Sequence, residues 1–281
     1  MTIDLHVHST ASDGTGSPAQ VMEDAAAAGL TVVALTDHDT TAGWEEASRA
    51  AVRHRLRLVP GAEISCRAGG IGVHMLSYLH DPSAPGLLAE LRRTRGDRLH
   101  RAARMVARIS VDYRLTWEDV ARHVGPDATV GRPHIADAMV ELGLVRSRDE
   151  AFATVLAAGT PYYVPHYAPD AVRTVRLIRE AGGVPVMAHP RAAQRGRIVD
   201  DGVLHSLAAA GMAGLEVWHR DQDAADRRHL LRLARELGLL ATGSSDYHGT
   251  GKVNRIGEHT TSPEVLDAIV AQSSGSAVVA G

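Results

Sequence analysis

Short apolar runs recur along this chain, and each of them ends in polar residues of the kinds that bind metal ions. The first run lies in residues 3–9, which read Ile-Asp-Leu-His-Val-His-Ser and place His6 and His8 two positions apart. Side chains two positions apart on a β-strand point to the same face, so a strand here makes the two imidazoles converge. The pattern predicts a strand whose polar face holds a metal ion.

Four further apolar runs follow the same design, and a shorter one precedes His74. The runs and their polar ends are 32–35 before Asp37-His38-Asp39, 56–59 before Glu63, 184–188 before His189, and 239–241 before Asp246-Tyr247-His248. Buried parallel strands read as short apolar runs of this kind. In barrels of alternating strands and helices, the reactive groups lie where the strands end. With the run at 215–218, the repetition predicts about seven strands whose ends form one site.

Segments with a helical period separate these strands. They include residues 19–28, which follow a proline suited to the first turn, residues 41–54 and residues 224–237. Strand and helix therefore alternate as they do in parallel α/β folds. We predict an α/β protein built on a distorted barrel.

The regular alternation breaks in the middle of the chain, because 115 residues separate His74 from His189. An arginine-rich helical stretch at 87–109 and shorter helical stretches at 117–124, 133–142 and 148–158 occupy this interval. We expect a small helical insertion at residues 93–162, over the active site. Residues 1–92 and 163–281 would form the barrel.

Composition limits the classes of protein that fit. The chain has 281 residues, 44% of them hydrophobic and 22% charged, as in one or two globular domains. A formal charge of −3 gives no general preference for nucleic acid, so attraction to phosphate must come from a local field. The one cysteine excludes an internal disulfide, and we find neither a signal peptide nor a membrane span. We expect a cytoplasmic protein with no membrane partner and no obligate protein partner.

These motifs resemble the hallmark of the polymerase and histidinol phosphatase (PHP) family. The matching segments are His6-Val7-His8-Ser9 with Asp13-Gly14, Thr36-Asp37-His38-Asp39, Ala188-His189-Pro190 and Ser245-Asp246-Tyr247-His248, with Glu63 and His74 between them. The resemblance covers nearly the whole chain and implies a distorted (β/α)7 barrel. Gly131-Arg132-Pro133-His134-Ile135-Ala136 resembles the signature of the branch with nucleoside 3′,5′-bisphosphate phosphatases and a 5′ exonuclease of short RNA. Histidinol phosphatases of the family lack that segment.

The resemblance implies two to three divalent metal ions. Carried over position by position, the first ion would be held by His6, His8, Glu63 and Asp246. Glu63 would bridge to a second ion held with His74 and His189, and the third would take Asp13, His38 and His248. Asp13 stands where other relatives carry histidine, so the third position is the one in which this chain departs from them.

The chemistry of these residues points to phosphate esters. Six imidazoles and three carboxylates without a thiolate suit manganese, iron or zinc. Such ions would attract a phosphate dianion and activate the water that attacks phosphorus. We therefore assign catalytic roles to Asp37, His38 and Asp13. Asp37 and Asp39 flank His38, and we expect at least one of them to orient a ligand imidazole.

Arg132 is our candidate for phosphate recognition, with His134 as a second donor, because a guanidinium matches two phosphate oxygens. We interpret most of the arginines at 92, 93, 95 and 98 as the solvated face of a helix. One or two of them could reach a second phosphate. Surface or capping roles are expected for the histidines without a strand-end context, at positions 54, 80, 100, 123, 166, 205, 219, 229 and 259.

Taken together, the sequence predicts a metal-dependent phosphoesterase that removes a phosphate monoester from a small nucleotide, a nucleoside 3′,5′-bisphosphate or monophosphate. Two alternatives stay open. One is a 5′-3′ exonuclease on short RNA oligonucleotides, which would use the same metals. The other is a PHP module without catalysis, which the full set of candidate ligands disfavours.

Overall fold

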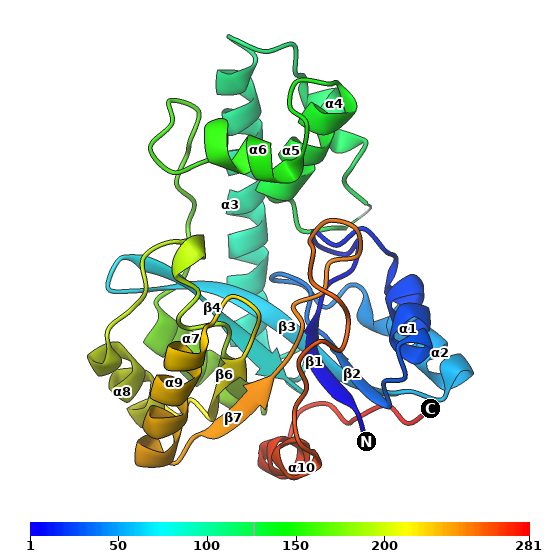
Figure 1. Cartoon of the computed structure of the whole chain (residues 1–281), viewed down its shortest axis with the longest axis vertical. Helices are drawn as coiled ribbons and strands as arrows, with labels where there is room; N and C mark the ends of the chain where they lie inside the picture. Colours follow the sequence, from blue (N-terminus) through cyan, green and yellow to red (C-terminus); the bar gives the residue numbers. More distant parts are fainter. Residues whose placement is uncertain (126) are drawn as a thin grey trace.

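A seven-stranded sheet forms the centre of the molecule, in a computed structural model that describes residues 1–125 and 127–281. The strands follow the order of the chain across the sheet: β1 (Ile3–Val7), β2 (Val32–Leu35), β3 (Arg57–Ala68), β4 (Ile71–Tyr78), β5 (Val184–Met187), β6 (Gly214–Trp218) and β7 (Leu240–Gly243). The predicted seven strands are all present, and they curve around a common interior (Figure 1).

Two of the strand pairs run antiparallel, which departs from the parallel strands that the apolar runs indicate. β1, β2 and β3 are parallel, and so are β5, β6 and β7, but β4 is antiparallel to both of its neighbours. Gly69 and Gly70 both have positive φ, of 56° and 79°, and make the tight turn between β3 and β4. Because His74 pairs with Ser65, it lies on the same face of the sheet as Glu63.

The first and last strands meet and nearly close the barrel. A parallel bridge joins Val7 to Tyr247, and the backbone N–H of His8 donates to the Tyr247 carbonyl at 2.8 Å. Farther along, the N–H of Thr261 donates to the carbonyl of Ile3. This closure sets the first histidine motif beside the last aspartate and histidine motif, although some 240 residues separate them in the chain.

Helices cover the outside of the barrel. They are α1 (Pro18–Ala27), α2 (Trp44–His54), α7 (Ala171–Glu180), α8 (Asp201–Ala209), α9 (Ala224–Leu237) and α10 (Pro263–Gln272). Side-chain caps start most of them: Ser17 and Asp223, for example, accept hydrogen bonds from backbone N–H groups of the first turn. Gly238, with φ of 66°, ends α9 in the left-handed conformation that glycine favours. α1, α2 and α9 lie within about three residues of their predicted ends.

A separate group of helices stands over one end of the barrel (Figure 1). It comprises the outer part of α3 (Pro85–Ile109) with α4 (Trp117–Ala121), α5 (Arg132–Glu141) and α6 (Arg148–Thr154). α3 serves both parts, because Leu87 and Leu91 pack in the barrel core while Met105 and Ile109 pack in a second core. That second core draws its buried residues from Ala102 to Val164. It supports the predicted insertion, whose boundaries at 93 and 162 remain a prediction.

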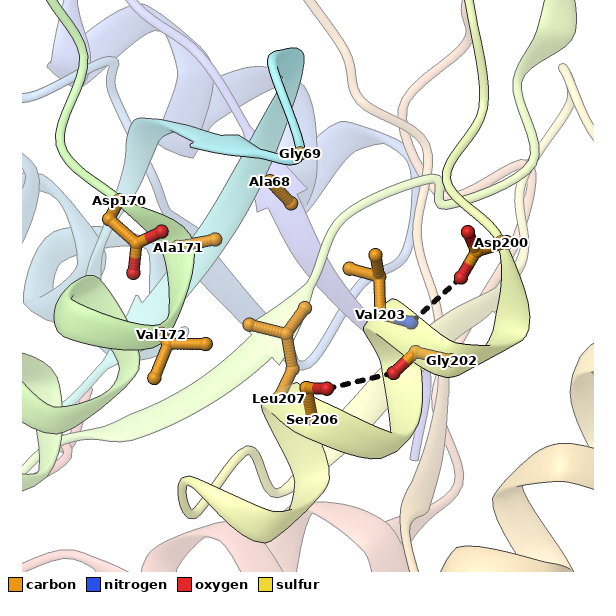
Figure 2. A pocket seen from close by; sticks show the side chains of 10 residues that line it. All are labelled: Ala68, Gly69, Asp170, Ala171, Val172, Asp200, Gly202, Val203, Ser206 and Leu207. Atoms are coloured by element: carbon orange, nitrogen blue, oxygen red, sulfur yellow. Dashed lines mark hydrogen bonds between the residues drawn. The ribbon is translucent and has the colours of Figure 1, made fainter.

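Two further features bear on where a ligand can bind. A shallow cavity of about 220 Å³ lies between the first turns of α7 and α8, lined by Asp170 and Asp200 among others (Figure 2). None of its lining residues is a predicted site residue. No helix in the described part of the chain is long and apolar enough to cross a membrane.

Candidate metal centre

The barrel closure brings the predicted metal ligands into one buried cluster at the end that faces the insertion. Their side-chain atoms form three overlapping groups, and within each group the ligand atoms lie within 4.8 Å of one another. The groups are His6, His8, Glu63 and Asp246; His8, Asp13, His38 and His248; and His38, Glu63 and His74. His8, Asp13, His38, Asp246 and His248 follow strand ends, as the apolar runs predicted, whereas Glu63 and His74 lie inside β3 and β4, which extend beyond them.

Glu63 occupies the centre of the first group. Its Oε2 lies 3.2 Å from Nε2 of His6 and 3.1 Å from Nε2 of His8. The two imidazole nitrogens are 3.0 Å apart, and Oδ1 of Asp246 is 3.4 Å from each of them. Ligand atoms that bind one ion at about 2.0–2.2 Å lie roughly 3–3.5 Å apart, so this spacing suits a single metal ion.

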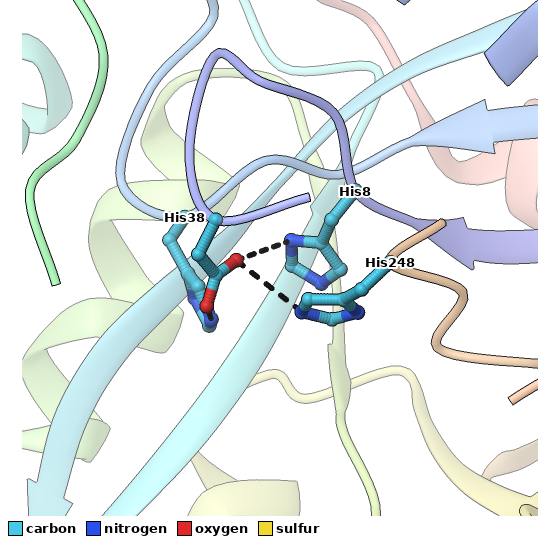
Figure 3. A group of neighbouring side chains, drawn as sticks. His8, His38 and His248 are labelled. Atoms are coloured by element: carbon cyan, nitrogen blue, oxygen red, sulfur yellow. Dashed lines mark ion pairs between the residues drawn. The ribbon is translucent and has the colours of Figure 1, made fainter. Parts of the chain in front are cut away.

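Asp13 joins three imidazoles in the second group. Its carboxylate lies 3.2 Å from Nε2 of His248, and 3.7 Å from both His8 and His38. Figure 3 shows the imidazole of His38 on one side and those of His8 and His248 on the other. The set expected for a third ion is therefore assembled, with His8 added to it.

The remaining two predicted ligands both approach the other oxygen of Glu63. Oε1 lies 2.7 Å from Nδ1 of His74 and 3.1 Å from Nε2 of His189. The group around His74 contains His38, whereas the expected second set named His189. His189 contacts the bridging carboxylate but does not fall within that trio.

The cluster fits metal ions by its unpartnered atoms and by its chemistry. Four buried ligand atoms make no hydrogen bond in the described structure: Nδ1 of His38, Nδ1 of His74, Oδ1 of Asp246 and Nε2 of His248. Buried polar atoms are normally hydrogen-bonded, so four such atoms in one cluster favour a ligand that they bind together. Nitrogen and oxygen donors without a thiolate suit manganese, iron or zinc. These residues would therefore hold divalent ions.

Electrostatics prepares several of these imidazoles to bind metal. Burial and the ammonium of Lys252 lower the pKa of His248 to about 4, and burial and the guanidinium of Arg195 lower that of His189 to about 3. Both are neutral at pH 7, the form that binds a metal ion. Burial opposes the charged form of His8 too, but the carboxylates of Asp246 and Glu63 outweigh it and raise its pKa to about 9. A metal ion must displace a proton there.

Glu216 supports the cluster from β6. His6 donates from Nδ1 to Oε1 of Glu216 at 3.0 Å, and the backbone N–H of His189 donates to Oε2 at 2.8 Å. A carboxylate that accepts the second N–H of a ligand imidazole fixes its tautomer and orientation. The sequence patterns assigned Glu216 no role. The available signal was one acidic residue inside an apolar strand.

The second oxygen of Asp246 is held by cations that sequence reasoning missed. Oδ2 accepts from Nη2 of Arg195 at 2.7 Å and from Nζ of Lys252 at 2.9 Å. Nε2 of His219 lies 3.5 Å from the same atom. The surface or capping role expected for His219 is wrong, because the residue is fully buried against this carboxylate, and His80 is fully buried as well.

Asp37 and Asp39 position loops and do not contact His38 in the described structure. Asp37 accepts hydrogen bonds from the backbone N–H and the hydroxyl of Ser9, and from Ser12 Oγ at 2.6 Å. Ser12 Oγ lies 3.4 Å from Nδ1 of His8, so Asp37 reaches a ligand imidazole only through Ser12. The expected orientation of a ligand imidazole therefore stays a prediction, and Asp37 holds the loop that carries Asp13.

The loops that carry the ligands have unusual backbone conformations. Asp39, His189 and Asp246 have positive φ values of 54°, 31° and 54°, in the region that residues other than glycine seldom adopt. Such strain persists where surrounding contacts hold it, and it concentrates at functional sites. Here it turns the chain sharply at the ends of three strands, so that neighbouring side chains reach the cluster.

Arg132 and His134 both lie in the first turn of α5. Arg132 is half-buried, donates from Nη1 to the Leu156 carbonyl at 3.0 Å, and lies 5.0 Å from the ring of Phe152. His134 is buried and accepts from the backbone N–H of Gly131 through Nδ1 at 3.1 Å, which leaves Nε2 available. Burial lowers the pKa of His134.

The predicted solvated helix face fits only part of the arginine set on α3: Arg92 and Arg93 are exposed, whereas Arg95 and Arg98 are half-buried. Nε of Arg98 forms an ion pair with Oδ2 of Asp39 at 2.9 Å, the guanidinium of Arg93 lies 3.8 Å from the centre of the Tyr167 ring, and Arg95 donates to the Asp127 carbonyl. Arg98 thus ties the insertion to the loop that carries His38.

Comparisons with known proteins agree with this site. A family model for the PHP domain matches residues 4–116. The chain is 35% identical to a 3′,5′-nucleoside bisphosphate phosphatase of Chromobacterium violaceum, over 92% of this chain and 91% of that protein. It is 34% identical to a 5′-3′ exoribonuclease of Haemophilus influenzae, over 87% and 89% of the two chains. A crystal structure of a proposed metal-dependent phosphoesterase from Bifidobacterium adolescentis superposes with a TM-score of 0.95 at 41% identity, covering 97% of this chain and 96% of that one.

A nearly closed seven-stranded barrel with a histidine and carboxylate cluster at one end defines a hydrolase that acts on phosphate esters and depends on divalent metal ions. The chain belongs to the PHP family. The predicted family, fold class and enzyme class are confirmed.

Proposed function

We propose that this protein hydrolyses a phosphate monoester of a small nucleotide, either a nucleoside 3′,5′-bisphosphate or a nucleoside monophosphate. The observation that carries the proposal is the cluster of eight ligand-type residues around Glu63, with His189 in contact with Glu63, beneath an insertion whose helix α5 bears Arg132 and His134. The 35% identity to a nucleoside bisphosphate phosphatase across nearly the full length of both chains supports it.

The cluster would hold two to three ions of manganese, iron or zinc. His6, His8, Glu63 and Asp246 would bind one, Glu63 with His74 and His189 a second, and Asp13, His38 and His248 a third. When bound, such ions polarise phosphate oxygens and supply an activated water as the nucleophile. The protein itself then needs no nucleophilic side chain.

The chain's own residues would hold the substrate and the ligands in place. Arg132 would contact a phosphate group with the part of its guanidinium not engaged by Leu156, and the stacked ring of Phe152 limits its motion. His134 would donate from Nε2 nearby. His38 and Asp13 would act at the reacting end as ligands, and Asp37 through the loop that carries Asp13.

A second function, 5′-3′ exonuclease action on short RNA, has equal support from the comparisons. The chain is 34% identical to the exoribonuclease of Haemophilus influenzae over most of both chains. Both activities would use the same metal cluster. The phosphatase would break a monoester bond and release inorganic phosphate. The exonuclease would break a phosphodiester bond between two nucleotides and release a mononucleotide.

Product analysis separates the two functions. Manganese-loaded protein would receive equal concentrations of adenosine 3′,5′-bisphosphate, AMP and a 5′-phosphorylated trinucleotide. Release of inorganic phosphate from the small nucleotides, with the trinucleotide chain uncut, is expected for the phosphatase. Stepwise release of mononucleotides from the trinucleotide would establish the exonuclease instead. Inertness toward all three would direct the search to other phosphate esters. A cytoplasmic location remains part of the proposal.

A further inference from the structure

The insertion contacts the two loops that carry the third set of metal ligands, and Arg148 makes that contact. Its Nη1 lies 3.4 Å from the carbonyl oxygen of Asp13 and 3.4 Å from that of Gly251. Asp13 is itself a candidate ligand, and Gly251 lies three residues beyond His248, to whose carbonyl it donates. One guanidinium therefore bridges both halves of this set from the first turn of α6.

Arg148 is itself held rigidly. Its Nε and Nη2 donate to the two carboxylate oxygens of Asp137 at 2.5 and 2.6 Å, in the paired geometry that a guanidinium and a carboxylate favour. Its side chain is only 15% exposed. Asp137 lies on α5, the helix that also carries Arg132 and His134, so the proposed phosphate-binding helix and the metal loops share this link.

Gly251 has the space for this guanidinium only because it lacks a side chain. A Cβ added at Gly251 would lie 2.2 Å from Nη1 of Arg148 and 2.9 Å from its Cζ. The φ angle of Gly251 is not positive, so glycine is required here because a side chain would not fit, and not because of its backbone conformation. The close packing indicates that this position of the arginine is built into the fold.

The two loops also contact each other directly, through Thr15. Its backbone N–H and its hydroxyl donate to the carbonyl of His248 at 3.1 and 3.3 Å. The hydroxyl also accepts from the N–H of Thr250 at 2.9 Å and lies 3.1 Å from the Thr250 hydroxyl, and Thr250 is exposed. Arg148 adds a charged group that contacts both loops at once.

We propose that Arg148 is a positioning residue for the third metal position, which it keeps assembled by fixing the distance between the Asp13 and His248 loops. The inference rests on the metal sites of the proposed function, but not on its substrate. Oδ1 of Asp13 and Nε2 of His248 are 3.2 Å apart in the structure, and an ion bound by both atoms requires that this separation is maintained. Lysine at 148 would keep the charge but cannot pair with Asp137 and reach two carbonyls together.

Metal binding without substrate tests the proposal. Full-length protein stripped of metal would be titrated with Mn²⁺ by calorimetry, and bound manganese would be counted by mass spectrometry after gel filtration. For Arg148→Lys and Gly251→Ala we expect the weakest manganese equivalent to lose about 10-fold or more in affinity, while the tighter equivalents keep theirs. Arg146→Ala is the matched control, because Arg146 is 91% exposed and pairs only with Glu150 in the described structure. The control should bind manganese like the wild type.

Several results would overturn the proposal. A wild-type protein that binds only two ions would remove the third position, and a uniform loss across all equivalents would indicate a general structural role. If both variants bind manganese with the affinities of the wild type, Arg148 does not position the third metal site. Circular dichroism identifies a variant that fails to fold, in which case the other variant decides. Because no nucleotide is present, a wrong substrate assignment leaves this test unaffected.

Discussion

The guanidinium of Arg195 donates to Oδ2 of Asp246 at 2.7 Å, which leaves Oδ1 of the same carboxylate directed at His6 and His8. Asp246 therefore presents one oxygen to cations of the protein and the other to the metal cluster. The ammonium of Lys252 also donates to Oδ2. This division explains how a buried carboxylate keeps its charge. Burial would raise the pKa of Asp246, but Lys252 and Arg195 hold it well below the ordinary value.

We expect Asp246→Asn to lose both metal and activity. The amide removes a negative charge from the centre of the cluster and leaves Arg195 and Lys252 facing a neutral group. Bound manganese and phosphate release would be measured on the same sample, with Asp267→Asn on the exposed face of α10 as the control. Full metal content in the variant would show that Asp246 is not a ligand.

Glu216→Gln should weaken metal binding without abolishing folding. The carboxylate orients His6 and the backbone of His189, and loss of such outer partners typically costs 10- to 100-fold in metal affinity. Manganese titration measures the loss, and Glu236→Gln, on the exposed side of α9, is the control. Affinity equal to that of the wild type would reduce Glu216 to a structural residue.

Arg132→Ala should leave metal content intact and raise KM for phosphate esters by about 10-fold or more, the effect of losing one or two charge-assisted hydrogen bonds. Steady-state kinetics and manganese content test this, with exposed Arg104→Ala on α3 as the control. Because Arg132 also lies over Phe152, the unfolding temperature is measured in parallel. Unchanged kinetics would move the phosphate contact to the arginines of α3.

His80 should make stability depend on pH. Burial lowers its pKa from 6.5 to about 4 in the folded protein, where it contacts Ser77 and Trp44. Between pH 6.5 and 4 the unfolded chain binds a proton at His80 that the folded protein does not. The contribution of His80 to the free energy of unfolding is therefore complete above pH 6.5 and is lost as the pH falls toward 4. The loss amounts to roughly 3 kcal/mol.

Urea unfolding of metal-free wild type and His80→Gln at pH 7.5, 5.5 and 4.5 checks this prediction. The difference in unfolding free energy between the two proteins should shrink as the pH falls, because glutamine binds no proton. A difference that stays constant over this range would mean that His80 titrates alike in the folded and unfolded chains.

Local patterns were enough for the elements and for most of the ligands. Strand periodicity placed His6 and His8 on one face, and the apolar runs marked the strand ends that precede His38, His189 and Asp246. The run before Glu63 found the strand but not its length, because β3 continues to Ala68. The direction of β4 escaped prediction because the apolar run that ends at His74 reads alike in a parallel and an antiparallel strand.

The sequence by itself determined the family, the strand ends and the types of ligand, because these depend on residues close together in the chain. Only the tertiary structure decided which groups support them. Glu216 reaches His6 across 210 positions and Arg195 reaches Asp246 across 51, since barrel closure sets distant strand ends side by side. The partners of Asp37, Asp246 and Arg148 are likewise chosen by packing, which no local period encodes.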